Sequence, residues 1–243
     1  MSDIQFLPRN YLRAMRRAAI ASDAIRNMLL VYHPNYETVW DPFLGDLIRD
    51  EYAAAKTNGT SAAVSVASSQ LTLTTGTDSD GYAGQGYGLF WTGDNGYYME
   101  SAQAINSVAD DKFEVGVTDV TSDAGAINAK ATPTFTATDC AILVLDSTDN
   151  AEFDLLSQDT SGGAANVEDV YTVVGGTIFR TEFVGQNDKV AVFVNGNHAG
   201  ADANCQGGVS ITPWWFAQTR TTSSKVATIE YVFMTGPNGL AIP

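Results

Sequence analysis

The feature that most constrains the fold of this chain is a series of short runs in which apolar and polar residues alternate. After residue 60 the clearest runs are 64–66, 71–73, 113–118, 190–194 and 229–233. A period of two places alternate side chains on one face of an extended strand, which packs on a core while the other face meets solvent. The side chains expected to share a face within their strands are Phe113, Val115 and Val117; Val190, Val192 and Val194; and Ile229, Tyr231 and Phe233.

Clusters of turn-forming residues separate these runs. Gly, Ser, Asp and Asn gather at 77–81, 161–163 and 195–196, where they favour tight turns. No long helical pattern lies between the runs, which disfavours β-α-β units and leaves an antiparallel sandwich or barrel. The sequence also lacks a fixed repeat and heptads, which disfavours a propeller, a solenoid or a fibrous shaft. Residues 57–243 are therefore predicted to form one mainly β domain.

Residues 1–56 have a different character. Residues 8–31 are rich in Ala, Leu, Arg and Met, and their apolar positions recur at helical spacing, which predicts a first helix. A second helix is predicted over 42–56, with Asp41 as its N-cap and a single apolar stripe. The chain is thus expected to begin with a short α-helical arm that precedes the β domain.

Charge is unevenly distributed along the chain. There are 13 basic and 28 acidic residues, and the formal net charge of −15 disfavours nucleic acid and anionic membranes as partners, because their phosphates would be repelled. The arginines of the arm that are expected to contact a partner are Arg9, Arg13, Arg16, Arg17 and Arg26. A basic arm on an acidic body indicates that the two ends of the chain face different surroundings.

The two cysteines are too few for a disulfide framework. Cys140 precedes the apolar run 141–145, so we expect it to be a buried free thiol. Residues 1–10 lack the basic and apolar regions of a signal peptide, and the apolar stretch 28–31 is too short to cross a bilayer. We therefore expect synthesis in a cytoplasm and no membrane partner.

Four segments, taken in order, resemble the concanavalin A-like (laminin G-like) sandwich. Residues 97–105 begin with aromatic side chains and then alternate, and 113–119 are similar to the F-x-V-G-F-x-D strand of such domains. Residues 190–196 end in V-N-G, and 229–233 resemble the final strand, which returns to the middle of its sheet. The resemblance spans about 60–240 and implies an antiparallel jelly-roll β-sandwich.

The same resemblance suggests a function. In tailed phages such sandwiches occur as capsid decoration proteins, head fibres and tail-associated modules, often after a short anchoring segment. The basic arm fits that layout, so the leading hypothesis is a non-enzymatic virion protein, homo-oligomeric, whose arm docks on the major capsid protein or another virion protein. The alternative is a carbohydrate-binding module, on a phage tail or a cell-surface protein.

A third hypothesis, a glycoside hydrolase, depends on one strand. Laminarinase-type hydrolases share the fold and carry E-x-D-x-x-E, whose two glutamates act as nucleophile and general acid. Glu152 and Asp154 match the first two positions, but Ser157 replaces the second glutamate, and in the shorter motif Leu156 does so. Since no group would then protonate the leaving oxygen, we interpret the segment as a non-catalytic strand.

Two turns carry several oxygen ligands of the kind that calcium prefers. They are 78–81 and 146–150, and the first candidates for calcium ligands are Asp78 and Asp80. The full EF-hand pattern is absent because no glutamate stands at its twelfth position. Asp and Asn also stabilise turns without any metal, so a purely conformational role is the alternative.

Aromatic residues offer a candidate contact surface. Trp214 and Trp215 are consecutive, so on a strand their side chains point to opposite faces, and one of them could contact a glycan or another subunit. Packing in the core is the alternative for both residues, since aromatic side chains dominate the cores of sandwiches.

Overall fold

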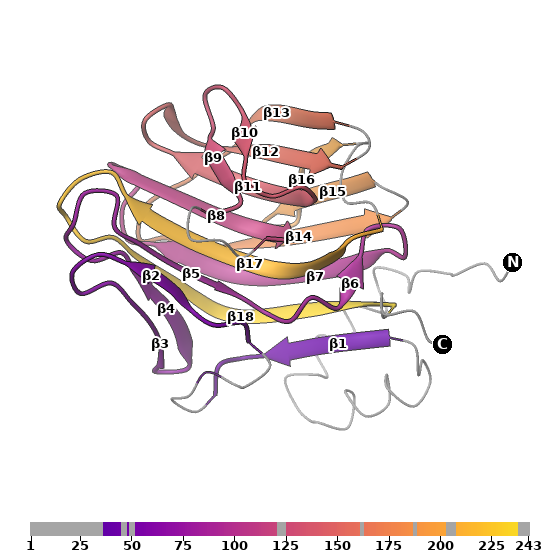
Figure 1. Cartoon of the computed structure of the whole chain (residues 1–243), viewed down its shortest axis with the longest axis horizontal. Coiled ribbons are helices and arrows are strands. Elements are labelled where there is room, and N and C mark those ends of the chain that lie inside the picture. Colours follow the sequence, from indigo (N-terminus) through magenta and orange to yellow (C-terminus); the bar gives the residue numbers. More distant parts are fainter. Residues whose placement is uncertain are drawn as a thin grey trace, which may run out of the picture.

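The structure, a computed structural model, is built from two large antiparallel β-sheets (Figure 1). It describes residues 36–44, 48, 52–120, 125–160, 163–186, 189–202 and 208–237. In this part of the chain, no helix has the length and apolar character needed to cross a membrane. The predicted mainly β, two-layer architecture is confirmed.

One sheet, here called the back sheet, contains the final strand near its middle. In spatial order its strands are β16 (Asn197–Asp202), β15 (Lys189–Val194), β14 (Phe179–Gln186), β7 (Tyr97–Ile105), β18 (Val226–Pro237), β4 (Gln70–Thr74) and β3 (Ala63–Ala67), and β1 (Tyr36–Asp41) also pairs with β18. The central position of β18 agrees with the predicted return of the last strand to the middle of its sheet.

The other sheet, here called the front sheet, carries the candidate functional site. In spatial order its strands are β13 (Gly163–Thr172), β12 (Asn150–Asp159), β11 (Cys140–Asp146), β8 (Asp111–Thr118), β17 (Ser210–Thr219), β5 (Tyr82–Gly86) and β2 (Lys56–Asn58), and β6 (Trp91–Thr92) also pairs with β17. A separate hairpin of β9 (Ile127–Ala129) and β10 (Thr134–Phe135) lies beside β11 on this sheet (Figure 1).

The main core lies between the two sheets and follows the predicted alternation. Phe113, Val115 and Val117 all point into it from β8, and Val190, Val192 and Val194 do so from β15. The residues between them in the sequence face the other way. Burial of these alternate apolar side chains stabilises the sandwich, at about 25 cal/mol for each Å² of apolar surface removed from water.

The predicted alternation fails in β18 because of a bulge. Its register against β7 shifts between Ile229 and Tyr231, so one extra residue changes which face the following side chains occupy. Ile229 is in the core, but beyond the bulge Val232 is in the core as well, while Tyr231 and Phe233 lie on the outer face. The prediction that Ile229, Tyr231 and Phe233 share one face is therefore wrong.

The sandwich begins earlier than the predicted boundary at residue 57. β1 pairs with β18 over its whole length, and Trp40 packs against Tyr231 with ring centroids 5.4 Å apart. The helix predicted over 42–56 is absent from its described residues, which are irregular until β2 begins at Lys56. Pairing with the sheets and burial in the core thus override the local helical preference.

The linking segment between β1 and β2 is held by aromatic side chains. Phe43 and Tyr52 are buried in the core with their rings 6.2 Å apart. Asp41, predicted as an N-cap, accepts a hydrogen bond from the backbone N–H of Phe43 at 2.7 Å and another from the Tyr52 hydroxyl at 3.1 Å. The helix predicted over 8–31 and the five arm arginines lie outside the described residues.

Candidate functional site

The middle of the outward face of the front sheet is covered by the chain itself. Residues 125–139, here called the cap, leave the sheet after β8, form the β9–β10 hairpin and return to β11. Apolar side chains of the cap and of the sheet beneath it form a second apolar cluster, here called the cap cluster. Its residues are Ala126, Ile127, Ala137, Cys140, Ile142, Val144, Leu156, Trp214 and Phe216. The expected buried free thiol at Cys140 is confirmed, and it lies in this cluster rather than in the main core.

The cap corrects the expectation for the two tryptophans. They do point to opposite faces of β17, because Trp215 lies in the main core and Trp214 in the cluster under the cap. Both side chains are fully buried, so neither forms a surface contact for a glycan or another subunit. The Trp214 ring instead stacks on Phe216, with centroids 6.1 Å apart and planes inclined by 15°.

A buried carboxylate holds the first end of the cap. Glu114 accepts hydrogen bonds from the backbone N–H groups of Ala126 at 2.8 Å and Ile127 at 3.1 Å, and from the Trp214 indole N–H at 2.9 Å. The ammonium of Lys112 lies 2.9 Å from the same carboxylate and also donates to the carbonyl of Ile127. A buried charge with this many partners fixes the cap in place.

A buried lysine holds the turn of the β9–β10 hairpin within the cap. The Lys130 ammonium donates to the carbonyl of Glu152 at 2.7 Å and to the Asn150 side chain, and it lies 3.3 Å from Asp154. Burial raises the pKa of Asp154, although the N–H of Asp169 and the charge of Lys130 oppose that shift. The positive charge of Lys130 thus compensates the nearby carboxylates of Asp149 and Asp154.

Beside the cap, one row of side chains crosses four strands of the front sheet. Gln218 on β17 is directly opposite Lys112 on one side and Tyr82 on the other, and Tyr82 is directly opposite Asn58 on β2. Gln218 follows Trp214 and Phe216 at a period of two, so the row points outward on the same face as the cap. Neighbouring strands lie about 4.8 Å apart, so the row is roughly 14 Å long.

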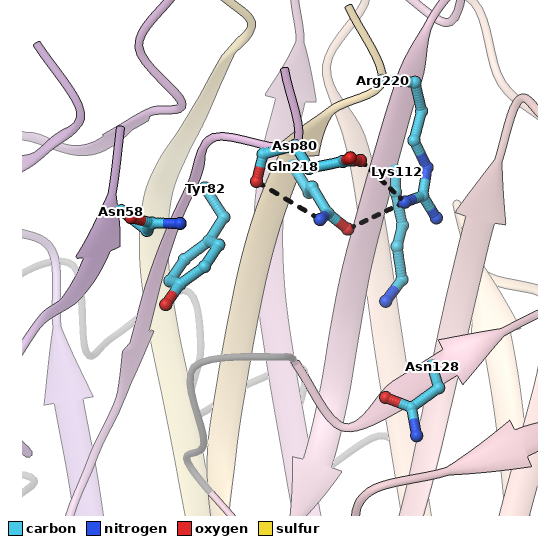
Figure 2. A pocket seen from close by; sticks show the side chains of 7 residues that line it. All are labelled: Asn58, Asp80, Tyr82, Lys112, Asn128, Gln218 and Arg220. Atoms are coloured by element: carbon cyan, nitrogen blue, oxygen red, sulfur yellow. Dashed lines mark hydrogen bonds and ion pairs between the residues drawn. The ribbon is translucent and has the colours of Figure 1, made fainter. Parts of the chain in front are cut away.

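The row forms the floor of a shallow cavity of about 420 Å³, here called the Tyr82 pocket. Its lining residues are Asn58, Asp80, Tyr82, Lys112, Asn128, Gln218 and Arg220. Figure 2 shows Asp80, Gln218 and Arg220 linked near its centre, with Tyr82 on one side and Lys112 on the other. The pocket thus combines one aromatic ring, three side-chain amides and a carboxylate.

The Tyr82 ring is a half-buried platform within this pocket. It packs on Phe216 with ring centroids 5.5 Å apart, and Phe216 in turn stacks on Trp214. Gly84 makes this packing feasible, because a Cβ atom there would lie 3.0 Å from both the Phe216 and Trp214 rings. The edge of the cap cluster therefore supports the floor of the pocket.

Arg220 organises the polar side of the pocket. Its guanidinium contacts Asp146 at 2.5 and 3.2 Å, Gln218 at 3.1 Å and Asp80 at 3.5 Å. Burial alone would raise the pKa of Asp146, but the hydrogen bonds and charge of Arg220, with two further bonds from Thr148, lower it below its ordinary value. Asp146 is therefore a carboxylate at neutral pH.

The motif related to the hydrolases lacks its second glutamate on the outward face that Glu152 and Asp154 share. Asp154 lies on the outward face, where it contacts Lys130. Ser157 is fully buried on the opposite side of β12, because it follows Phe153 and Leu155, which point into the main core. The position of the missing glutamate therefore faces away from Glu152 and Asp154.

The two calcium candidates serve other purposes in the structure. Asp78 accepts a hydrogen bond from the backbone N–H of Thr60 at 2.8 Å, and Asp80 lies 3.5 Å from Arg220. Among the described residues, no group of three or more His, Cys, Asp and Glu side chains could hold a metal ion. The other candidate turn, 146–150, has its carboxylates directed at Arg220 and Lys130.

Sequence reasoning did not single out Tyr82, Gln218 or Arg220. The useful signal was the continuation of the alternation in β17, where Gln218 follows two outward aromatic residues in phase. Asn58 and Tyr82 come from strands that are distant from β17 in the sequence, so their position in one row depends on the strand order. Of the predicted site residues, Asp80 lines the pocket.

Comparisons with known proteins identify the fold. No protein-family model matches the sequence, and no curated protein matches it. The structure of LamAcat from Zobellia galactanivorans is 10% identical, with a TM-score of 0.59 over 81% of this chain and 96% of that chain. A structure reported for endo-acting O-glycanases of the human gut microbiota is 8% identical, with a TM-score of 0.56 over 81% and 97% of the two chains.

A lectin domain is similar to the same degree. The carbohydrate recognition domain of Emp47p is 9% identical, with a TM-score of 0.56 over 82% of this chain and 95% of that chain. At such identities these likenesses show the fold alone. The chain is therefore a concanavalin A-like β-sandwich, as its resemblance implied, and it shares this fold with lectin domains and glycoside hydrolases.

Proposed function

We propose that the chain is a non-catalytic carbohydrate-binding module and that the Tyr82 pocket binds the glycan. The observation that carries the proposal is the outward row of Asn58, Tyr82, Gln218 and Lys112, with Asp80 and Asn128 at its rim. The cavity of about 420 Å³ falls within the range of roughly 300–1,000 Å³ that small-molecule sites occupy.

The side chains of the pocket match the chemistry of a sugar. A pyranose ring has an apolar C–H face, which can pack on the half-buried ring of Tyr82. Its hydroxyl groups both donate and accept hydrogen bonds, so they suit the amides of Asn58 and Asn128 and the carboxylate of Asp80. These three residues are exposed at the surface and lie on different strands or turns.

The shared fold supports binding, and the geometry of β12 supports the absence of catalysis. One neighbour is a carbohydrate recognition domain, and a variant of LamA with a TM-score of 0.59 was solved in complex with laminaritriose and laminaritetraose. In this chain Ser157 occupies the third motif position and faces the core. Two carboxylates on opposite sides of a glycosidic bond are therefore not provided by this motif.

The virion role suggested by the basic arm stays a prediction, and it concerns where such a module would be displayed. Truncation tests it, because removal of residues 1–31 should leave a folded sandwich that no longer joins particles. Normal incorporation of the truncated chain would show that the arm is not an anchor. Glycan binding in the Tyr82 pocket does not depend on the outcome.

A glycan array tests the binding proposal. We expect the wild type to bind at least one glycan and Tyr82→Ala to bind it about tenfold more weakly or not at all, since the stacking surface is lost. Phe193→Ala is a matched control, because Phe193 is a half-buried aromatic residue on β15 of the back sheet. Melting curves would confirm that both variants are folded.

Two outcomes would contradict the proposal. One is a wild-type protein that binds nothing on an array that includes β-glucans, mucin-type O-glycans and N-glycans. The other is a Tyr82→Ala variant that is folded and binds as tightly as the wild type. Weaker binding by Phe193→Ala alone would move the site to the back sheet.

A further inference from the structure

We infer that the Tyr82 pocket selects uncharged saccharides and discriminates against sialylated, sulfated and uronic-acid glycans. This inference rests on the proposed glycan binding and adds the class of ligand. Its basis is the way in which every cation at the pocket is already paired within the protein. The surplus charge there is negative and lies at the open side.

Lys112 cannot offer its charge to a ligand. Its side chain is 1% exposed, and the ammonium lies 2.9 Å from Glu114 and donates to the carbonyl of Ile127. It also lies 5.2 Å from the centre of the Phe216 ring, so part of its positive charge faces an aromatic surface. An anion in the pocket would have to compete with these buried partners.

Arg220 is similarly occupied. A guanidinium has five N–H groups, and the contacts with Asp146, Gln218 and Asp80 use four of them. The pair with Asp146 is bidentate, and its carboxylate is almost fully buried. Bidentate pairs of this kind are the strongest ionic contacts that arginine makes, so a ligand carboxylate or sulfate would not displace it.

The charge balance at the pocket leaves one negative charge. The two cations, Lys112 and Arg220, face the three carboxylates of Glu114, Asp146 and Asp80. Asp80 has a side chain that is 64% exposed, so the surplus lies where a ligand would arrive. The net charge of the whole chain, −15, adds to the negative potential at the pocket.

This arrangement of charges favours the binding of a neutral sugar and weakens the binding of an acidic sugar. The Asp80 carboxylate can accept charge-assisted hydrogen bonds from hydroxyl groups. A ligand anion a few ångströms away would instead be repelled, by an amount that weakens binding by about tenfold at low salt and less at high salt. Selectivity should therefore shrink as ionic strength rises.

The experiment measures affinities for probes that differ in charge. Lactose, laminaritriose and cellotriose are the neutral probes, and 3′-sialyllactose and trigalacturonic acid are the acidic ones, each titrated calorimetrically at 20 mM and 500 mM NaCl. We expect binding of a neutral probe and at least tenfold weaker binding of the acidic probes at low salt. Tighter binding of an acidic probe would overturn the inference and leave the proposed function intact.

Asp80→Asn is the decisive variant. Asp80 has a positive φ of 60°, a conformation that asparagine also tolerates, so the turn should keep its shape. We expect the variant to lose most of the discrimination against acidic probes. Asp94→Asn is the matched control, because Asp94 is exposed and lies between β6 and β7, at the opposite end of β17.

The outcomes separate the inference from the proposed function. Unchanged selectivity in Asp80→Asn would overturn the role given to this carboxylate. An equal change of selectivity in Asp94→Asn would show that the discrimination comes from the overall charge of the chain and not from the pocket. If no probe bound the wild type and the glycan array were also blank, the proposed function would fail, and the inference with it.

Discussion

Single buried charges decide much of the chemistry of the front sheet. Lys112, Glu114 and Lys130 are almost fully buried, and each has several partners. Charges in such positions cost free energy to desolvate, so they persist only where hydrogen bonds and opposite charges compensate. They are therefore expected to specify the position of the cap more than to add to overall stability.

Asp111 is a buried charge with poor compensation, and it predicts how stability depends on pH. Burial raises the pKa of this carboxyl well above its usual value near 3.8, and the charges of Lys225 and Arg220 offset that only in part. One carboxyl oxygen has no hydrogen-bond partner in the described structure. A raised folded-state pKa favours folding below about pH 3.8, and this contribution is lost as the pH rises through the folded-state value.

Asp111→Asn removes the free-energy cost of burying this carboxylate. We expect the variant to melt at a higher temperature than the wild type at pH 7, and the two melting temperatures to converge toward pH 4. Calorimetric scans across that range measure the difference. Asp110→Asn is a neighbouring exposed control, and equal effects of the two substitutions would contradict the explanation.

At the scale of elements, one glycine shows how closely the strands of the front sheet pack. A Cβ atom at Gly116 on β8 would lie 2.1 Å from the backbone carbonyl oxygen of Ala141 on β11. Neither backbone can move without disturbing the ladder. The glycine of the F-x-V-G-F-x-D pattern is thus required by contact between neighbouring strands.

Gly116→Ala should destabilise the protein by about 3 kcal/mol, since backbone atoms cannot yield as a flexible side chain would. Urea unfolding measures the change. Gly200→Ala is the control, because a Cβ there would make only ordinary contacts, the closest at 3.4 Å. A loss below 0.5 kcal/mol for Gly116→Ala would mean that the strands separate more easily than the packing implies.

The elements that sequence predicted well are those with an uninterrupted period of two. β8 and β15 have their predicted inward faces, whereas β18 does not, because one bulged residue reverses the faces and leaves no mark in the composition. Residues 127–138 of the cap also alternate apolar and polar positions, but this pattern does not show which face of which sheet the segment covers. Their position depends on tertiary partners such as Glu114, which a local pattern does not reveal.

The candidate site was predicted only in part, for the same reason. Asp80 was named as an oxygen ligand, and it does line the pocket, but as the partner of Arg220. Trp214 was named for its aromatic surface, which the cap covers. The row of Tyr82 and Gln218 arises from strand order, and strand order is set by the whole fold.

For the whole molecule, the corrected boundary makes a clear prediction about truncation. Removal of residues 1–35 leaves both sheets complete in the described structure, whereas removal of 1–56 takes away β1. It also removes Val39, Phe43 and Tyr52 from the core. Each buried apolar side chain contributes about 1.5–3 kcal/mol, so the loss of three should make the longer deletion cost at least roughly 4.5 kcal/mol more.

Chemical denaturation of the two truncated chains measures this difference. Equal stability would show that the β domain is independent of everything before residue 57, the boundary predicted from the sequence. Loss of cooperative unfolding in both chains would instead show that residues 1–35 contribute to the fold. The full-length chain is the reference for each comparison.

The cap also bears on how such a protein could change. It lies between β8 and β11 in the sequence, and Thr118, the last residue of β8, is directly paired with Cys140, the first residue of β11. A short turn could therefore join the same two strands without altering the order of the sheet. The front face is thus an exchangeable part, which descendants or designers could shorten into an open groove or lengthen into a new binding loop, while the rest of the sandwich keeps its architecture.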